Sequence, residues 1–102
     1  MVQIPMDKER IGAFCRNWKV AELALFGSVL RDDFSPHSDV DVLVSFLPDA
    51  KHSLFDLVRM QEDLKGILGR EVDLVERTAV EQSKNYIRRK EILKSLEVIH
   101  AA

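Results

Sequence analysis

The chain reads Ser38-Asp39-Val40-Asp41-Val42-Leu43-Val44 a little before its middle. Valine occupies alternate positions, and the positions between the valines begin with two aspartates. Because successive side chains of a strand point to opposite faces, this pattern predicts a strand with one apolar face and one face that is acidic at its start. Two carboxylates on one face repel each other unless cations neutralise them, so Asp39 and Asp41 are candidate metal ligands.

A glycine–serine pair precedes the acidic strand. Gly27 and Ser28 follow an apolar run from Ala21 to Phe26, which we interpret as a buried strand, and they open a short helical turn. Glycine lets a phosphate approach the backbone closely, and the free N–H groups at the start of a helix favour an anion. The Ser28 hydroxyl adds a donor, and Arg31 is placed to reach a terminal phosphate or to pair with a neighbouring aspartate. The sequence therefore predicts a phosphate-binding turn.

A third acidic strand follows further along the chain. The short apolar run from Val72 to Val75 contains Asp73, which we expect to be the third metal ligand and a candidate base for an attacking hydroxyl. Two Mg²⁺ ions held by such carboxylates clamp an in-line displacement at phosphorus. A lone Asp-x-Asp is usually a solvated strand end, and a lone Gly-Ser is usually only a turn. Together, in this order along the chain, they indicate metal-assisted nucleotidyl transfer.

Helical patterns surround these segments. A first helix is predicted to begin near Pro5, a second to end at Gly69, and a charged last helix to run from about Ala79 to Ile99. The order helix, strand, strand, helix, strand, helix predicts one α/β or α+β domain over residues 1–102, with a small mixed β-sheet covered by helices. The predicted apolar faces of the three helices comprise Ile11, Phe14, Cys15 and Trp18; Leu54, Leu57, Val58, Leu64 and Leu68; and Ile92, Leu96 and Ile99.

Composition excludes several classes of protein. The 102 residues suit one domain, and the formal net charge of -2 gives no general attraction to nucleic acid or to an anionic membrane. The longest apolar run is far below the roughly 20 residues that span a bilayer. The only cysteine, Cys15, excludes an internal disulfide and is expected in the core. We therefore expect a cytoplasmic protein without direct binding to membranes or nucleic acid.

The segment predicted as the last helix is basic. Its cations are most simply a solvated face with ion pairs to neighbouring glutamates. The alternatives are a docking surface for an acidic partner, or a cation that reaches the triphosphate. These cations are Lys84, Arg88, Arg89, Lys90 and Lys94.

The motifs resemble those of the nucleotidyltransferase superfamily related to DNA polymerase β, and most of all its small prokaryotic branch, the minimal nucleotidyltransferases. The likeness extends from about Asp7 to Ile99. The superfamily pattern is a Gly-Ser turn, a later Asp-x-Asp and an Asp on a following strand. In this chain the pattern corresponds to Gly27-Ser28, to Asp39 with Asp41, and to Asp73.

The resemblance implies a polymerase β-like nucleotidyltransferase fold and the role of a type VII antitoxin. It implies Mg²⁺-dependent transfer of AMP from ATP to a tyrosine hydroxyl of a partner HEPN-domain RNase toxin, which neutralises the toxin. In this interpretation Asp39 and Asp41 hold two metal ions, Asp73 completes the metal site and helps to deprotonate the acceptor, and Gly27 and Ser28 hold the triphosphate. Because the chain is short for a second domain, we expect the partner to present the acceptor.

Two alternatives stay open. The chain is a non-catalytic antitoxin that inhibits its partner by occlusion, or it transfers a nucleotide to a small molecule or to RNA. Many relatives read Gly-Ser-x-Ala-Arg-Gly, whereas this chain has Leu30 and Asp32 in place of the alanine and the final glycine. Asp32 adds a negative charge near the expected phosphates.

Overall fold

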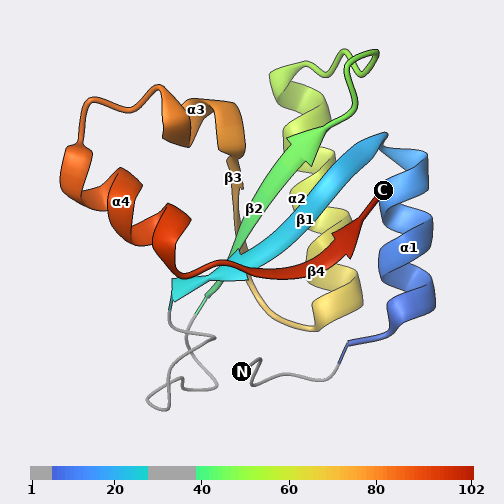
Figure 1. Cartoon of the computed structure of the whole chain (residues 1–102). Helices are drawn as coiled ribbons and strands as arrows, with labels where there is room; N and C mark the ends of the chain where they lie inside the picture. Colours follow the sequence, from blue (N-terminus) through green and yellow to red (C-terminus); the bar gives the residue numbers. More distant parts are fainter. Residues whose placement is uncertain (1–5, 28–38) are drawn as a thin grey trace.

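The computed structural model describes residues 6–27 and 39–102, which form a sheet with helices around it (Figure 1). The strand order is β3-β2-β1-β4. β1 is antiparallel to both β2 and β4, whereas β2 is parallel to β3. The predicted mixed sheet is thereby confirmed, with one strand more than expected. The strands are β1 (Val20–Phe26), β2 (Val40–Phe46), β3 (Val72–Glu76) and β4 (Glu97–Ala101).

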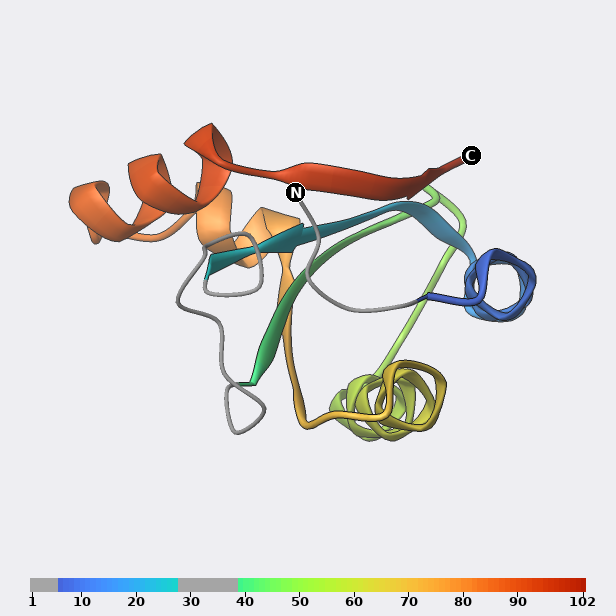
Figure 2. The same ribbon diagram turned by 90° about the horizontal axis from the view of Figure 1, so that it is seen from below.

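Helices cover both faces of the sheet, with α1 and α2 on one side and α3 and α4 on the other (Figure 2). The alternation in β2 decides which side chains meet which pair of helices. Val42 and Val44 are fully buried against α1 and α2, whereas Leu43 is buried against α3 and α4. Each such side chain contributes roughly 1.5–3 kcal/mol to stability. The helices are α1 (Lys8–Asn17), α2 (Leu54–Leu68), α3 (Arg77–Glu81) and α4 (Tyr86–Lys94).

The predicted helix from about Ala79 to Ile99 is wrong. This part of the chain forms the end of α3, then α4 and β4. Asn85 interrupts the helical run, because its side chain accepts a hydrogen bond from the backbone N–H of Arg88 at 3.1 Å and caps the first turn of α4. The predicted order of elements therefore lacked a helix boundary and a fourth strand.

The apolar residues near the C-terminus explain the error. Leu96 and Ile99 have the spacing of a helix face, but Leu96 packs with the α3–α4 core and Ile99 packs with the α1–α2 core. Residues 97–101 instead pair with β1 from Glu22 to Leu25. This pairing joins segments far apart in the sequence, and it overrides the local helical pattern.

The boundaries of α1 and α2 follow from their caps. Asp7 precedes α1, and its side chain accepts a hydrogen bond from the Glu9 N–H at 3.0 Å. The start predicted at Pro5 lies outside the described residues. Gly69 ends α2 as predicted, with φ 69° and its N–H donating to the Lys65 carbonyl at 2.8 Å.

The apolar face predicted for α2 is only partly confirmed. Leu64 and Leu68 are buried, and Met60 completes the buried row at helical spacing. Leu54 and Val58, which were predicted on the same face, are 81% and 60% exposed. The first turn of α2 therefore presents apolar side chains to solvent.

No helix in the described part of the chain has the length and apolar character needed to cross a bilayer.

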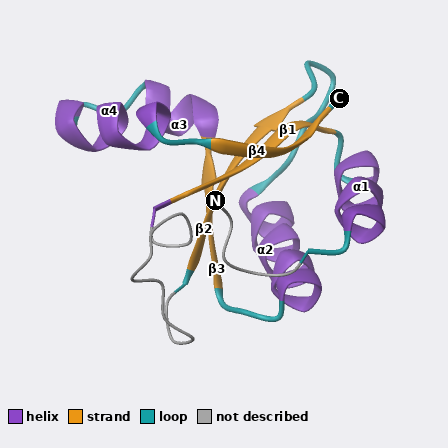
Figure 3. Ribbon diagram, turned by 60° about the horizontal axis from the view of Figure 1, so that its bottom comes forward, coloured by secondary structure: helices purple, strands orange, loops and turns teal. Residues whose placement is uncertain are grey.

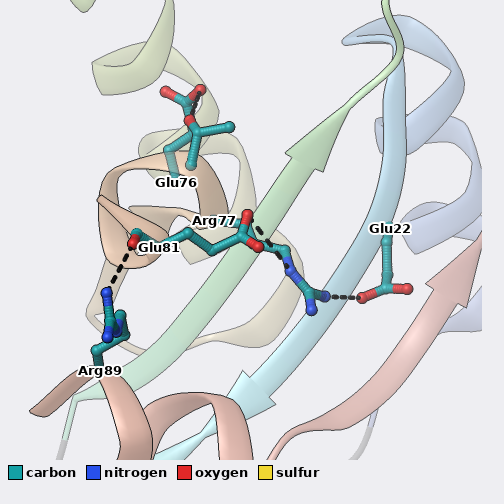
Figure 4. A network of polar contacts seen from close by, with 6 residues as sticks. Glu22, Glu76, Arg77, Glu81 and Arg89 are labelled. Atoms are coloured by element: carbon teal, nitrogen blue, oxygen red, sulfur yellow. Dashed lines mark hydrogen bonds and ion pairs between the residues drawn. The ribbon is translucent and has the colours of Figure 1, made fainter. Parts of the chain in front are cut away.

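A polar network ties α3 and α4 to the sheet (Figure 4). Arg77 donates from Nη1 to Glu22 Oε1 at 3.0 Å, and its Nε lies 4.0 Å from Glu81 Oε1. Arg89 of α4 donates from Nη1 to the backbone carbonyl of Glu81 at 3.2 Å. Because Glu22 belongs to β1, these contacts connect both helices to the face of the sheet that they cover.

Gly66 in the interior of α2 is expected to tolerate alanine with a gain in stability. A Cβ at this position meets no atom within 4 Å, and alanine loses less backbone entropy than glycine when a helix forms. Gly66→Ala should raise the free energy of unfolding by about 0.5–1 kcal/mol, as measured by urea denaturation. An unchanged or lower midpoint would contradict the helical environment assigned to this residue.

Cys15 is expected to resist alkylation in the folded protein. The side chain is 1% exposed, and burial raises the pKa of the thiol to about 11. Near pH 8 the thiol therefore stays protonated, and the reactive thiolate forms only when the chain unfolds. Iodoacetamide at pH 8 should leave the native protein unmodified and label it in urea, as read by intact mass. Rapid labelling of the native protein would show that Cys15 is accessible.

Candidate active site

Two of the three predicted carboxylates stand opposite each other in the sheet. Asp41 of β2 pairs in register with Asp73 of β3, and the two strands run side by side in the same direction (Figure 3). Neighbouring strands lie roughly 4.8 Å apart, and residues in register share a face. That face is the one covered by α3 and α4, because Leu43, two residues after Asp41, packs in their core. The structure thus brings Asp41 and Asp73 together at the end of this face.

Gly27 lies against this acid pair. It follows β1 with φ 76°, a backbone conformation that residues with a Cβ rarely adopt. A Cβ added to Gly27 would overlap Asp41 Oδ2 and lie 3.3 Å from Asp41 Cγ. Both the backbone angle and the space available therefore require glycine. The end of β1 that was predicted to open a phosphate-binding turn is in direct proximity to one of the predicted metal ligands.

Asp39 stands at the edge of the site. It is exposed and directly precedes β2, whose first N–H, from Val40, donates to the Glu71 carbonyl at 2.9 Å. Alternation places Asp39 on the same face as Asp41. Among the residues that the structure describes, no three His, Cys, Asp or Glu side chains are gathered closely enough to hold a metal ion. The acid pair is therefore formed by the sheet, and the structure does not show Asp39 completing a set of three.

The chemistry of these donors fits a hard divalent cation. Carboxylate oxygens are the ligands that Mg²⁺ prefers, and Mg²⁺ keeps several positions for water and phosphate oxygens. Asp73 is exposed and Asp41 is half-buried, so the pair is open to solvent and to a substrate. Ser28 and Arg31, the other predicted phosphate-binding residues, lie outside the described residues.

A cavity of about 650 Å³ adjoins Gly27 between the end of β1 and α4. Its walls combine apolar, charged and amide side chains. The sequence does not predict this cavity, because its helical pattern runs without a break from about Ala79 to Ile99. The signal was Asn85, a residue favoured at the first position of a new helix. The lining residues are Phe26, Gly27, Asn85, Ile87, Arg88, Glu91, Ile92 and Ser95.

The sequence matches a family model described as a nucleotidyltransferase domain over residues 8–97. This chain belongs to that family. The family expected from the Gly-Ser turn and the three aspartates is thereby confirmed. The matched range extends from α1 to the first residue of β4, so the nucleotidyltransferase domain includes both layers of helices and the acid pair.

Two curated relatives are similar to part of this nucleotidyltransferase domain. A candidate protein adenylyltransferase of Methanocaldococcus jannaschii (MJ0435) is 41% identical over 56 residues, which are 55% of this chain and 58% of the relative. The protein adenylyltransferase MntA of Thermococcus cleftensis is 38% identical over 61 residues, which are 60% of each chain. The chain therefore spans about three fifths of the length of these relatives.

Solved structures share the fold. A toxin–antitoxin complex with AMP-PNP contains a chain that superposes with a TM-score of 0.69 at 17% identity, over 95% of this chain and 75% of that one. A second complex holds a tri-AMPylated Shewanella oneidensis HEPN toxin with an MNT antitoxin, and its matching chain gives a TM-score of 0.60 at 18% identity, over 93% of this chain and 70% of that one. At these identities the likeness establishes the nucleotidyltransferase fold of this domain.

Proposed function

We propose that this chain is an antitoxin that transfers AMP from ATP to a tyrosine hydroxyl of a partner HEPN-domain RNase and thereby neutralises it. The observation that carries the proposal is the acid pair of Asp41 and Asp73, in register on parallel strands, with Gly27 in close proximity. The names of the relatives support the reaction, since one is a protein adenylyltransferase MntA. A fold neighbour in complex with a tri-AMPylated HEPN toxin supports the partner.

The three carboxylates share one role in this proposal, and Asp73 has a second. Asp39, Asp41 and Asp73 hold Mg²⁺, which when bound neutralises charge that develops on the phosphate oxygens. Asp73 is exposed on its strand, so it is accessible to an incoming hydroxyl and accepts the proton of that hydroxyl. The hydroxyl oxygen then bonds to the α-phosphorus, the bond between the α- and β-phosphates breaks, and pyrophosphate leaves.

The turn after β1 orients the nucleotide in the proposal. Gly27 lets the phosphate chain pass close to the backbone beside Asp41, where a Cβ has no space. The Ser28 hydroxyl and the Arg31 guanidinium donate hydrogen bonds to the phosphates. Binding by these groups places the α-phosphorus next to the acid pair. The acceptor then attacks a phosphate that is already positioned, which lowers the entropic cost of the transfer.

A second candidate function is inhibition by occlusion without catalysis. Leu54 and Phe55 are each 81% exposed and Val58 is 60% exposed at the start of α2, and exposed apolar side chains in a group are typical of partner-binding surfaces. In this case the chain covers the toxin, and the acid pair plays no part in neutralisation.

The intact mass of the HEPN partner distinguishes the two functions. The partner is incubated with this chain, ATP and Mg²⁺, and is then analysed by mass spectrometry and by an RNase assay. Transfer predicts a gain of one or more AMP units, located on tyrosine by fragmentation, together with loss of RNase activity. An unchanged mass with suppressed RNase activity would instead favour occlusion, and an unchanged mass with full RNase activity would contradict both.

A further inference from the structure

The cavity between β1 and α4 adjoins, at Gly27, the place where the phosphates are proposed to lie. Gly27 forms part of its wall and is also the residue whose Cα lies against the Asp41 carboxylate. The opposite wall is α4, which contributes Arg88 and Glu91. A molecule bound at the acid pair can therefore extend along the sheet face, past Gly27 toward α4.

Arg88 is placed between this cavity and a second one of about 150 Å³. The first cavity reaches Gly27 after β1, and the second reaches Val75 of β3. Arg88 thus lies between the end of β1 and β3, the two strands that flank β2. Within the described part of the chain, the Arg88 guanidinium makes no ion pair or side-chain hydrogen bond. Its positive charge and its donors are available to an anion in this region.

Glu91 gives the same cavity a different kind of group. It lies three residues after Arg88 on α4, and residues at this spacing share one helix face. An ionised carboxylate only accepts hydrogen bonds, so it suits a hydroxyl and repels a phosphate. Apolar side chains from Phe26, Ile87 and Ile92 line other parts of the wall, together with Asn85 and Ser95. The cavity thus combines a donor that suits phosphates, an acceptor that suits hydroxyl groups, and apolar surface that suits a ring system.

We infer that this cavity holds the nucleoside part of the nucleotide, with Arg88 donating to the phosphate chain and Glu91 accepting hydrogen bonds from the ribose hydroxyls. The inference rests on the proposed function for the location of the phosphates. The volume of about 650 Å³ lies in the range of roughly 300–1,000 Å³ that small-molecule sites occupy. Arg88 and Glu91 are therefore residues that bind substrate, in addition to those of the turn and the acid pair.

Binding of α,β-methylene-ATP tests this inference without requiring transfer, because the bond that transfer breaks is blocked in this analogue. Calorimetric titration with Mg²⁺ compares the wild type with Arg88→Gln, Glu91→Gln and Arg59→Gln. Arg59 is exposed on α2, across the sheet from the cavity, so Arg59→Gln is the matched control for the loss of a guanidinium. Circular dichroism checks that each variant is folded.

Arg88→Gln should weaken binding of the analogue roughly tenfold, and that of inorganic triphosphate by a similar factor, since a charged hydrogen bond to phosphate is lost. Glu91→Gln should weaken binding of the analogue about fivefold and should not weaken binding of inorganic triphosphate, because the lost charge repels phosphate. Its effect should also disappear with the 2′,3′-dideoxy form of the analogue, which has no ribose hydroxyls. Arg59→Gln should bind as the wild type does.

The outcomes separate this inference from the proposed function. Unchanged affinities for both α4 variants, with a wild type that binds the analogue and modifies its partner, would overturn the inference and keep the function. A wild type that binds no nucleotide would overturn both. If both α4 variants bind the analogue more weakly as expected, but the wild type never modifies its partner, the result would support the nucleoside site and refute the transfer. If Glu91→Gln weakens binding of the dideoxy analogue as much as that of the analogue with its ribose hydroxyls, the contact between Glu91 and the ribose would be refuted.

Discussion

Asp41→Asn is expected to lower AMP transfer to the partner by on the order of a thousandfold. The asparagine has nearly the same shape, but it lacks the negative charge that holds a divalent cation. Asp41 also lies next to Gly27 and directly opposite Asp73. The substitution therefore changes the carboxylate that links the phosphate-binding turn to the acid pair. The measurement is the rate at which the intact mass of the HEPN partner increases in the presence of ATP and Mg²⁺.

Asp49→Asn is the matched control for this loss. Asp49 is exposed beyond the far end of β2, where its Oδ2 pairs with Lys19 Nζ at 3.1 Å. The hydrogen bond and charge of Lys19 hold the pKa of Asp49 below its usual range, so the pair is ionised at neutral pH. Exposed pairs of this kind contribute little to stability, and the Asp49→Asn protein should transfer AMP at the wild-type rate. Retained transfer by Asp41→Asn, in a folded protein, would refute the assignment of the acid pair.

Gly27→Ala should reduce both stability and transfer. Two costs combine at this position: an alanine with φ 76° is strained, and its Cβ overlaps the Asp41 carboxylate. We expect the free energy of unfolding to fall by about 2–4 kcal/mol. The displaced Asp41 side chain no longer faces Asp73 correctly, and a misplacement of about 1 Å is expected to lower transfer on the order of a hundredfold.

Gly69→Ala separates the two costs. Gly69 also has a positive φ, of 69°, but a Cβ there meets nothing within 4 Å. This variant should therefore lose only the conformational term of about 1–2 kcal/mol, and its transfer rate should be unchanged. Urea denaturation of both variants gives the difference, which measures the overlap with Asp41. Equal destabilisation by the two substitutions, with equal transfer rates, would contradict the close approach of Gly27 to the acid.

The sequence predicted the elements whose signals are local. The alternation of Val40, Val42 and Val44 identified β2 and its acidic face, because side chains of one face of a strand recur with a period of two. Gly69 marked the end of α2 for a similar reason, since a left-handed cap favours glycine. Alternation alone also predicted that Asp39 and Asp41 share one face of their strand.

The elements that depend on distant contacts were not predictable. β4 exists because residues 97–101 pair with β1, and nothing within the segment distinguishes it from the end of a helix. The exposure of Leu54 and Val58 has the same origin, since the sheet determines which part of α2 is covered. The cavity beside Gly27 requires the break at Asn85, which turns α4 away from the line of α3 (Figure 1). In the sequence, Arg88 was therefore one of several cations in a basic segment, for which contact with the triphosphate was one of three interpretations.

The register between β2 and β3 has a consequence for how this protein tolerates mutation. Asp73 lies on the same face as Asp41 only because Val72 and Leu74, on either side of it, face the α1–α2 core. A slip of one residue would exchange the two faces and carry a carboxylate into the apolar core, at a cost of several kcal/mol. Loss of the acid pair by slippage is therefore inseparable from loss of the core. In a library of variants selected only for stable folding, the register between β2 and β3 should therefore be kept. The relative positions of Asp41 and Asp73 are then preserved without any selection for activity.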